Sequence, residues 1–122
     1  MRVVLIDSGG ANIGSVRYAL QRLGIDAPLS GDVAEIRAAD RVILPGVGAA
    51  APAMARLREL GLVDTIRSLT QPLLGICLGM QLLFEGSDEG GVETLGLLPG
   101  RVGRLRGGPG LRVPHMGWNR LE

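Results

Sequence analysis

The chain has 122 residues, of which 46% are hydrophobic and 20% charged, so it has room for one compact domain with a buried core but not for two. Its formal net charge is +1, and this balance gives no electrostatic footprint for nucleic acid. A single cysteine excludes an internal disulfide, and no cluster of histidine and cysteine suggests a metal site. The first apolar run is too short for a signal peptide or a membrane span, so the cytoplasm is the expected compartment.

Apolar runs and helical patterns alternate over the first two thirds of the chain. The runs predict strands at 3–6, 25–29 (weakly), 41–44 and 72–76. Helical spacing, caps and stops predict helices from 12 to 23, from 32 to 37 with Asp32 as the cap, from 49 to 60, from 62 to 69 and from 78 to 84. This alternation predicts an α/β fold with a central parallel sheet.

The alternation of predicted strands and helices ends after Phe84. Residues 85–91 are expected to form a polar loop, and residues 94–105 a strand or a hairpin around Leu98-Pro99-Gly100. A glycine-rich turn is expected over 106–110, and residues 113–121 are irregular.

The lone cysteine lies in Gly75-Ile76-Cys77-Leu78-Gly79, between a predicted strand and a predicted helix. In that place G-x-C-x-G is typical of a nucleophile elbow, where a strained turn projects the side chain from the end of the sheet. The helix N-terminus favours a thiolate, and the N–H of Leu78 would point toward an oxyanion. The alternative is that Cys77 is a small buried hydrophobic residue and that the glycines serve close packing.

A second glycine-rich loop follows another predicted strand. Pro45-Gly46-Val47-Gly48 lies at the carboxyl end of that strand, which is the edge where open α/β sheets place ligands. Glycines there let backbone N–H groups approach a substrate and supply a second oxyanion donor. The alternative is an ordinary turn from strand to helix.

Four stretches, in order, carry a resemblance: residues 6–13 (IDSGGANI), 44–48 (LPGVG), 74–83 (LGICLGMQLL) and 114–119 (PHMGWN). The chain resembles the class I glutamine amidotransferases, whose elbow reads G-x-C-x-G-x-Q, with Gln81 as the last residue here. Within them it is most similar to the glutaminase subunits of imidazole glycerol phosphate synthase in histidine biosynthesis. The resemblance implies a flavodoxin-like, open, mostly parallel sheet with helices on both faces, in one amidotransferase domain over residues 1–122.

The resemblance also implies a reaction. The cysteine thiolate attacks the side-chain amide of glutamine, which gives a glutamyl thioester and ammonia, and water then releases glutamate. The ammonia passes to a (β/α)₈-barrel cyclase subunit, the implied heterodimer partner, and no cofactor takes part. No nucleic acid or membrane is implied as a partner.

The motifs assign roles to residues by the same resemblance. Cys77 is the nucleophile, the N–H of Leu78 is an oxyanion donor, and Gly46, Val47 and Gly48 form the loop that completes the oxyanion hole when the partner activates the enzyme. The remaining positions match residues that hold glutamine (Gln81 and Glu89) or contact the cyclase (Asn12 and Trp118). For Asn12 a helix N-cap is the alternative, and for Trp118 a surface aromatic.

A cysteine nucleophile needs a base, and the chain has one histidine, His115. It falls inside the PHMGWN stretch, where the family does not place its base, and no His-Pro-Glu motif is found. We therefore expect the chain to represent the N-terminal portion of the family's domain, with the C-terminal third missing, and to be inactive alone. The alternatives are a non-catalytic module that only docks on the cyclase, and a different cysteine enzyme on a similar sheet, such as a peptidase or a pyridoxal phosphate-synthase glutaminase.

Overall fold

The computed structural model describes residues 1–9 and 13–122. Its helices are α1 (Ile13–Arg22), α2 (Val33–Ala38), α3 (Ala50–Glu59), α4 (Val63–Arg67) and α5 (Leu78–Gln81). Its strands are β1 (Val3–Ile6), β2 (Leu29–Ser30), β3 (Arg41–Leu44), β4 (Leu73–Gly75), β5 (Gly86–Ser87), β6 (Val92–Glu93) and β7 (Arg101–Val102).

The first four strands form one parallel sheet. Their order is β2-β1-β3-β4, and every pair of neighbours runs in the same direction. This is the strand order of the flavodoxin-like class, in which the sheet edge at the carboxyl ends of the strands carries the ligand site. The parallel sheet expected from the sequence is therefore confirmed.

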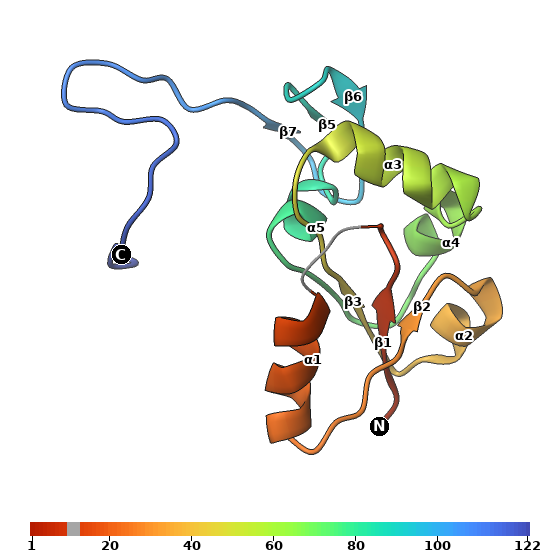
Figure 1. Ribbon diagram of the computed structural model, residues 1–122. Coiled ribbons are helices and arrows are strands. Elements are labelled where there is room, and N and C mark those ends of the chain that lie inside the picture. Colours follow the sequence, from red (N-terminus) through yellow and green to blue (C-terminus); the bar gives the residue numbers. More distant parts are fainter. Residues whose placement is uncertain (10–12) are drawn as a thin grey trace.

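Helices cover both faces of this sheet (Figure 1). Successive strand residues point to opposite faces, so Val3 and Leu5 of β1 pack with α1 on one side, while Val4 and Ile6 join the larger core on the other. That larger core contains residues of α2, α3, α4 and α5. β1 and residues 42–44 of β3 are apolar and buried because helices cover both faces of the sheet, whereas β4 at the edge is only partly buried.

The polar region after α5 contains a second, small sheet that the sequence did not indicate. Its order is β6-β5-β7, with β5 antiparallel to β6 and parallel to β7. The expected polar loop over 85–91 is therefore wrong where Gly86 and Ser87 form a buried strand. Of the strand or hairpin expected over 94–105, only the strand β7 is present, and no hairpin forms around 98–100, because β6 and β7 both pair with β5 and not with each other.

Two further boundaries differ from the expectations. The weak strand expected over 25–29 is displaced to Leu29–Ser30, since the chain joins the sheet only after Pro28. The helix expected to reach Phe84 ends at Gln81. It ends early because the carbonyl oxygens of Leu82 and Leu83 accept hydrogen bonds from the N–H groups of Leu95 and Leu97 at 2.8 Å instead of continuing the helical ladder.

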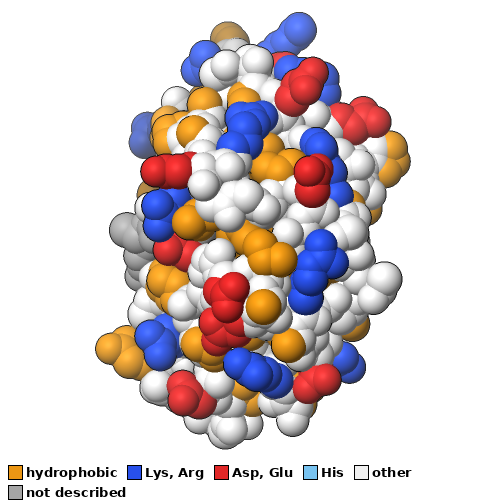
Figure 2. Space-filling model, turned by 90° about the vertical axis from the view of Figure 1, so that its right-hand side faces the viewer, with side chains coloured by type: hydrophobic (Ala, Val, Ile, Leu, Met, Phe, Trp, Pro, Cys, Tyr) orange, Lys and Arg blue, Asp and Glu red, His pale blue; other side chains and the backbone are white. Residues whose placement is uncertain are grey.

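Residues 103–122, called the C-terminal arm below, leave the small sheet and extend away from the body (Figure 1). All of them are exposed. On the face of the body that Figure 2 shows, arginine and acidic side chains are interspersed, with no patch of one sign. Over the described part of the chain, no helix has the length and apolar character that crossing a membrane requires.

Candidate active site

Cys77 stands at the junction of β4 and α5, at the carboxyl edge of the sheet. Its backbone angles are φ 55° and ψ −118°, and no other non-glycine residue in the described ranges has a positive φ. L-residues avoid this region because the Cβ atom meets the neighbouring carbonyl oxygen. The side chain is exposed, so the alternative of a buried hydrophobic filler does not fit the structure.

Close contacts with neighbouring backbone atoms explain why both elbow positions carry glycine. A Cβ atom built on Gly75 would lie 2.6 Å from the Cα of Met80, and one built on Gly79 would fall onto the carbonyl oxygen of Leu44. Real Cβ atoms do not come so close to backbone atoms. Only glycine at these two positions therefore lets α5 start directly against β3 and β4, with Cys77 held at the turn.

The contribution of α5 to a thiolate is smaller than the sequence indicates. The helix has four residues, and Cys77 takes its N-cap position without a side-chain hydrogen bond. A helix dipole is a sum over aligned peptide units, so one turn supplies little of it.

The loop after β3 lies against the elbow. The N–H of Leu78 donates to the carbonyl oxygen of Gly46 at 3.3 Å, and the hydroxyl of Ser8 donates to the carbonyl oxygen of Pro45 at 2.7 Å. Pro45 and Gly46 are buried, whereas Val47 and Gly48 are exposed. The expected oxyanion donor at Leu78 is therefore turned toward the expected oxyanion loop and is occupied by it.

The two residues expected to hold glutamine line one cavity. Gln81 and Glu89 share its wall with Arg104 and His115, and the cavity has a volume of about 390 Å³. Neither the carboxylate of Glu89 nor the guanidinium of Arg104 has a hydrogen bond or an ion pair to any residue that the structure describes. The cavity thus presents an unpaired carboxylate, an unpaired guanidinium group and an amide. Cys77 is not among its lining residues.

The other expected site residues are not brought to Cys77. His115 and Trp118 both belong to the C-terminal arm, where the ring of His115 contacts the amide of Asn119 at 2.7 Å and Trp118 is fully exposed. Asn12 lies outside the described residues. Within the described ranges, no group of three or more metal-binding side chains forms a candidate metal site.

Three residues near the site escaped the sequence interpretation. Ser8 ties β1 to the loop after β3, although its only signal was membership of the IDSGGANI stretch. Asp88 and Arg101 form an ion pair at 3.2 Å between β5 and β7. They are thirteen positions apart in the sequence and no periodicity links them, so only the strand pairing reveals the contact.

Comparisons with known proteins agree with this geometry. The family model for "Glutamine amidotransferase class-I" matches residues 4–120. The chain is 66% identical over 119 residues to "Imidazole glycerol phosphate synthase subunit HisH" of Xanthomonas axonopodis pv. citri, and 65% identical to the protein of the same name from Xylella fastidiosa strain Temecula1. Each alignment covers 98% of this chain and 60% of the relative, so the chain spans about three fifths of these relatives' length.

A solved structure shares the fold. The "Crystal structure of glutamine amidotransferase" superposes with a TM-score of 0.67 and 25% sequence identity, over 78% of this chain and 52% of that chain. Fold, elbow and family model agree, and the chain belongs to the class I glutamine amidotransferase family.

Proposed function

We propose that the chain carries the glutaminase function of imidazole glycerol phosphate synthase, in which ammonia from glutamine feeds histidine biosynthesis. The Sγ atom of Cys77, as a thiolate, attacks the side-chain amide carbon of glutamine. The C–N bond breaks, the amide nitrogen takes up a proton and leaves as ammonia, and a glutamyl thioester remains. Water then hydrolyses the thioester to glutamate and frees the thiol.

This proposal rests on Cys77, whose backbone is strained and whose side chain is exposed. Close backbone contacts at the elbow exclude a Cβ atom at both flanking glycines. Strained non-glycine conformations persist where the surrounding structure enforces them, and they concentrate at functional sites. Six relatives that are 64% to 66% identical to the chain are named as subunits of imidazole glycerol phosphate synthase, which supports the choice of this synthase among amidotransferases.

The same proposal assigns the neighbouring residues. Glutamine occupies the cavity beside Gln81 and Glu89, and the carboxylate of Glu89 takes the α-ammonium group. The loop of Gly46, Val47 and Gly48 releases the N–H of Leu78 when the oxyanion forms. A (β/α)₈-barrel cyclase receives the ammonia as heterodimer partner, with Asn12 and Trp118 as interface residues.

We propose in addition that these 122 residues alone do not turn over glutamine. The described residues bring no imidazole into hydrogen-bond contact with Cys77, and His115 contacts Asn119 in the C-terminal arm. The same observation keeps a second candidate function open, a module that docks on the cyclase without chemistry.

A glutamate-release assay with the chain alone, with the Xanthomonas cyclase subunit, and with cyclase plus its ligand tests both parts. Turnover by the chain alone contradicts its proposed inactivity. A Cys77→Ala variant provides the control for chemistry at the thiol. If the cyclase binds the chain and Cys77→Ala changes neither glutamate release nor reaction with glutamine analogues, the docking module replaces the glutaminase.

A further inference from the structure

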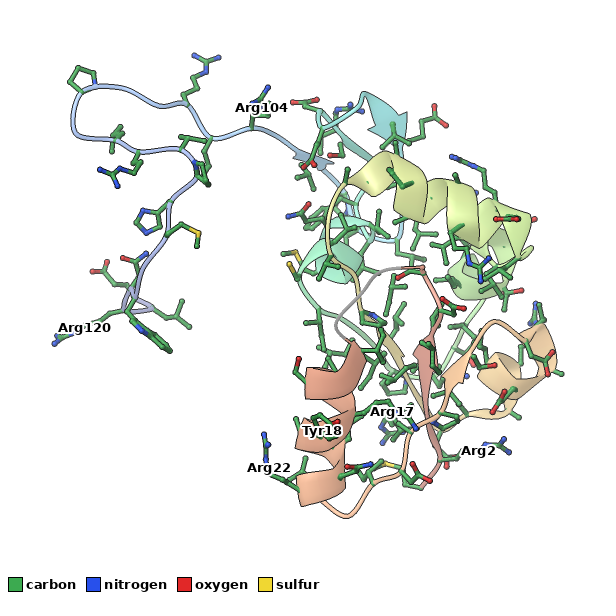
Figure 3. All side chains as sticks on the ribbon, in the orientation of Figure 1. Arg2, Arg17, Tyr18, Arg22, Arg104 and Arg120 are labelled. Carbon is green, nitrogen blue, oxygen red and sulfur yellow. The ribbon has the colours of Figure 1, made fainter. Side chains whose placement is uncertain are left out.

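Two groups of side chains lie on the small sheet and on the segments that follow its strands. Ser87 and Glu89 from the β5 side, with Val102 and Arg104 from the β7 side, line the proposed glutamine cavity. The lining on the β7 side continues through Gly103 and Leu105, and Glu89 itself lies in the turn that follows β5. Figure 3 labels Arg104 at the point where the chain leaves β7.

Gly86, Asp88 and Arg101 are not among the residues that line the cavity. Gly86 and Arg101 are register partners in the parallel pairing of β5 with β7. From there the guanidinium of Arg101 reaches Asp88, with Nε and Nη2 each 3.2 Å from the same carboxylate oxygen. One ion pair outside the cavity lining thus joins the residue preceding Glu89 to the neighbouring strand.

The backbone on either side of this pair is held as well. The N–H of Asp88 donates to the carbonyl oxygen of Val102 at 2.9 Å, and the N–H of Glu89 donates to the hydroxyl of Ser87 at 3.2 Å. Ser87 is fully buried, so its hydroxyl has little room to move and holds the N–H of Glu89 in place. Beyond Glu89 the chain turns through Gly90 and Gly91, both with positive φ, and glycine adds no stiffness of its own.

Gly86 has a specific place in the arrangement. A Cβ atom built on it would fall onto Nη1 of Arg101 and lie 3.0 Å from its Cζ. The guanidinium therefore lies across the bare backbone of Gly86 on its way to Asp88. A methyl group at this position would displace the end of a flexible side chain without changing any charge, and it would also lie 3.2 Å from the carbonyl oxygen of Val92 in β6.

We propose that Arg101 is a positioning residue for glutamine binding: through Asp88 it holds the turn after β5 that presents Glu89 to the cavity. This inference rests on the proposed function, since it assigns Glu89 to the glutamine α-ammonium. The pair is about half exposed, with side chains 51% and 54% accessible, so it adds little to global stability. Its effect is local and falls on the orientation of Glu89.

The test uses the complete 122-residue chain and a glutamine analogue that carries a chloromethyl ketone in place of the side-chain amide. The Cys77 thiolate displaces chloride, a C–S bond forms, and intact-mass spectrometry follows the adduct. The dependence of the rate on analogue concentration gives KI, which reports recognition, and kinact, which reports the thiol. Iodoacetamide, which has no amino-acid group, gives the reactivity of Cys77 without recognition.

Arg101→Gln is expected to raise KI by about twofold to fivefold, the range for an exposed ion pair, and to leave kinact and the iodoacetamide rate unchanged. Arg101→Lys keeps the charge and is expected to lie between Arg101→Gln and the unmodified chain. Gly86→Ala should raise KI like Arg101→Gln, and amide hydrogen exchange at Asp88 and Glu89 should accelerate in both variants. Arg37→Gln, with an exposed arginine on α2, is the control with the same change of charge.

Two failures are distinguishable. If the unmodified chain saturates with the analogue but Arg101→Gln has the KI of Arg37→Gln, the positioning role is wrong and the proposed glutamine site stands. If the unmodified chain shows no saturation, the glutamine site itself is wrong, and the role of Arg101 in recognition falls with it. A loss of thermal stability in Arg101→Gln beyond that of Arg37→Gln, together with a changed iodoacetamide rate, would show a general structural role instead.

Discussion

The N–H of Leu78 donates a hydrogen bond to the carbonyl oxygen of Gly46, across 3.3 Å, between the elbow and the loop after β3. This contact joins the two glycine-rich segments that the sequence assigned separately to oxyanion stabilisation. An N–H group that donates to a carbonyl oxygen is not free to receive an oxyanion. The proposed chemistry therefore requires Gly46 to give up this contact, and variants of the loop test how firmly it is held.

Gly46→Ala is expected to separate the two segments. Its Cβ atom would lie 3.0 Å from the N atom of Gly79 and 3.1 Å from the Cβ of Leu78, which is overpacking of buried backbone. We expect a loss of about 1–3 kcal/mol in the free energy of unfolding and faster amide exchange at Leu78. Gly48→Ala is the control, because nothing lies within 4 Å of a Cβ there and only the positive φ opposes it. Equal Leu78 exchange in the two variants would contradict close packing at Gly46.

Cys77→Gly is expected to be more stable than Cys77→Ala by about 1 kcal/mol. Both variants lose the thiol, but alanine keeps the Cβ atom that makes φ 55° unfavourable. Relief of such strain is worth about 1–3 kcal/mol, and the extra chain entropy of glycine offsets about 0.5–1 kcal/mol of it. Urea unfolding measures the difference.

A glycine substitution at an unstrained position provides the control for the sign of that difference in stability. Ala55→Gly on the exposed side of α3 should destabilise the chain by about 1 kcal/mol, because the helix there has ordinary geometry. If Cys77→Gly is also less stable than Cys77→Ala, the elbow is not strained.

Ser8→Ala is expected to lower the free energy of unfolding by about 1–3 kcal/mol. The Ser8 hydroxyl is buried and donates to the carbonyl oxygen of Pro45 at 2.7 Å, so alanine leaves a buried acceptor without this donor. Ser68→Ala removes a hydroxyl bond to the Thr65 carbonyl at an exposed residue, and we expect a change within about 0.5 kcal/mol. Chemical denaturation of the two variants, measured together, checks the contrast. Equal losses would show that the link from β1 to the loop contributes nothing specific.

Leu74→Thr is expected to change the free energy of unfolding by less than about 0.5 kcal/mol and to reduce self-association. Leu74 is 58% exposed on β4, which pairs with β3 on one side only in the described sheet, so an apolar side chain and a strand edge face solvent together. Leu5→Ala, at a buried position of β1, should cost about 2–5 kcal/mol. Light scattering and urea unfolding measure the two effects. Unchanged self-association in Leu74→Thr would mean that the chain does not self-associate through this strand edge.

Most of the parallel sheet could be predicted because its signals are local. β1 and β3 have the predicted bounds, since a strand buried on both faces needs a continuous apolar run. α2 begins after the expected cap, with the Asp32 side chain accepting from the N–H of Ala34 at 3.2 Å. β2 was displaced because an edge strand of two residues leaves too short a pattern to locate.

The small sheet could not be predicted for a related reason. β5, β6 and β7 have two residues each, and they pair across up to fifteen positions of sequence. Glycine and polar residues in this region carry no alternation, so residues 85–91 were interpreted as a loop and only a strand or a hairpin over 94–105 was expected. Pairing between strands supplies the missing information, and it also explains why Asp88 and Arg101 were overlooked.

The sequence by itself determined the elbow. Gly75, Cys77 and Gly79 stand between an apolar run and a helical pattern, and the requirement for glycine at Gly75 arises from Met80, a few residues along the chain. The requirement at Gly79 comes instead from Leu44 in β3, so the tertiary structure sets it. Only the tertiary structure decided that the Leu78 N–H is occupied by Gly46 and that Arg101 braces the strand leading to Glu89. These contacts join segments that meet only when strands pair, and the register of that pairing fixes them, whereas local pattern does not.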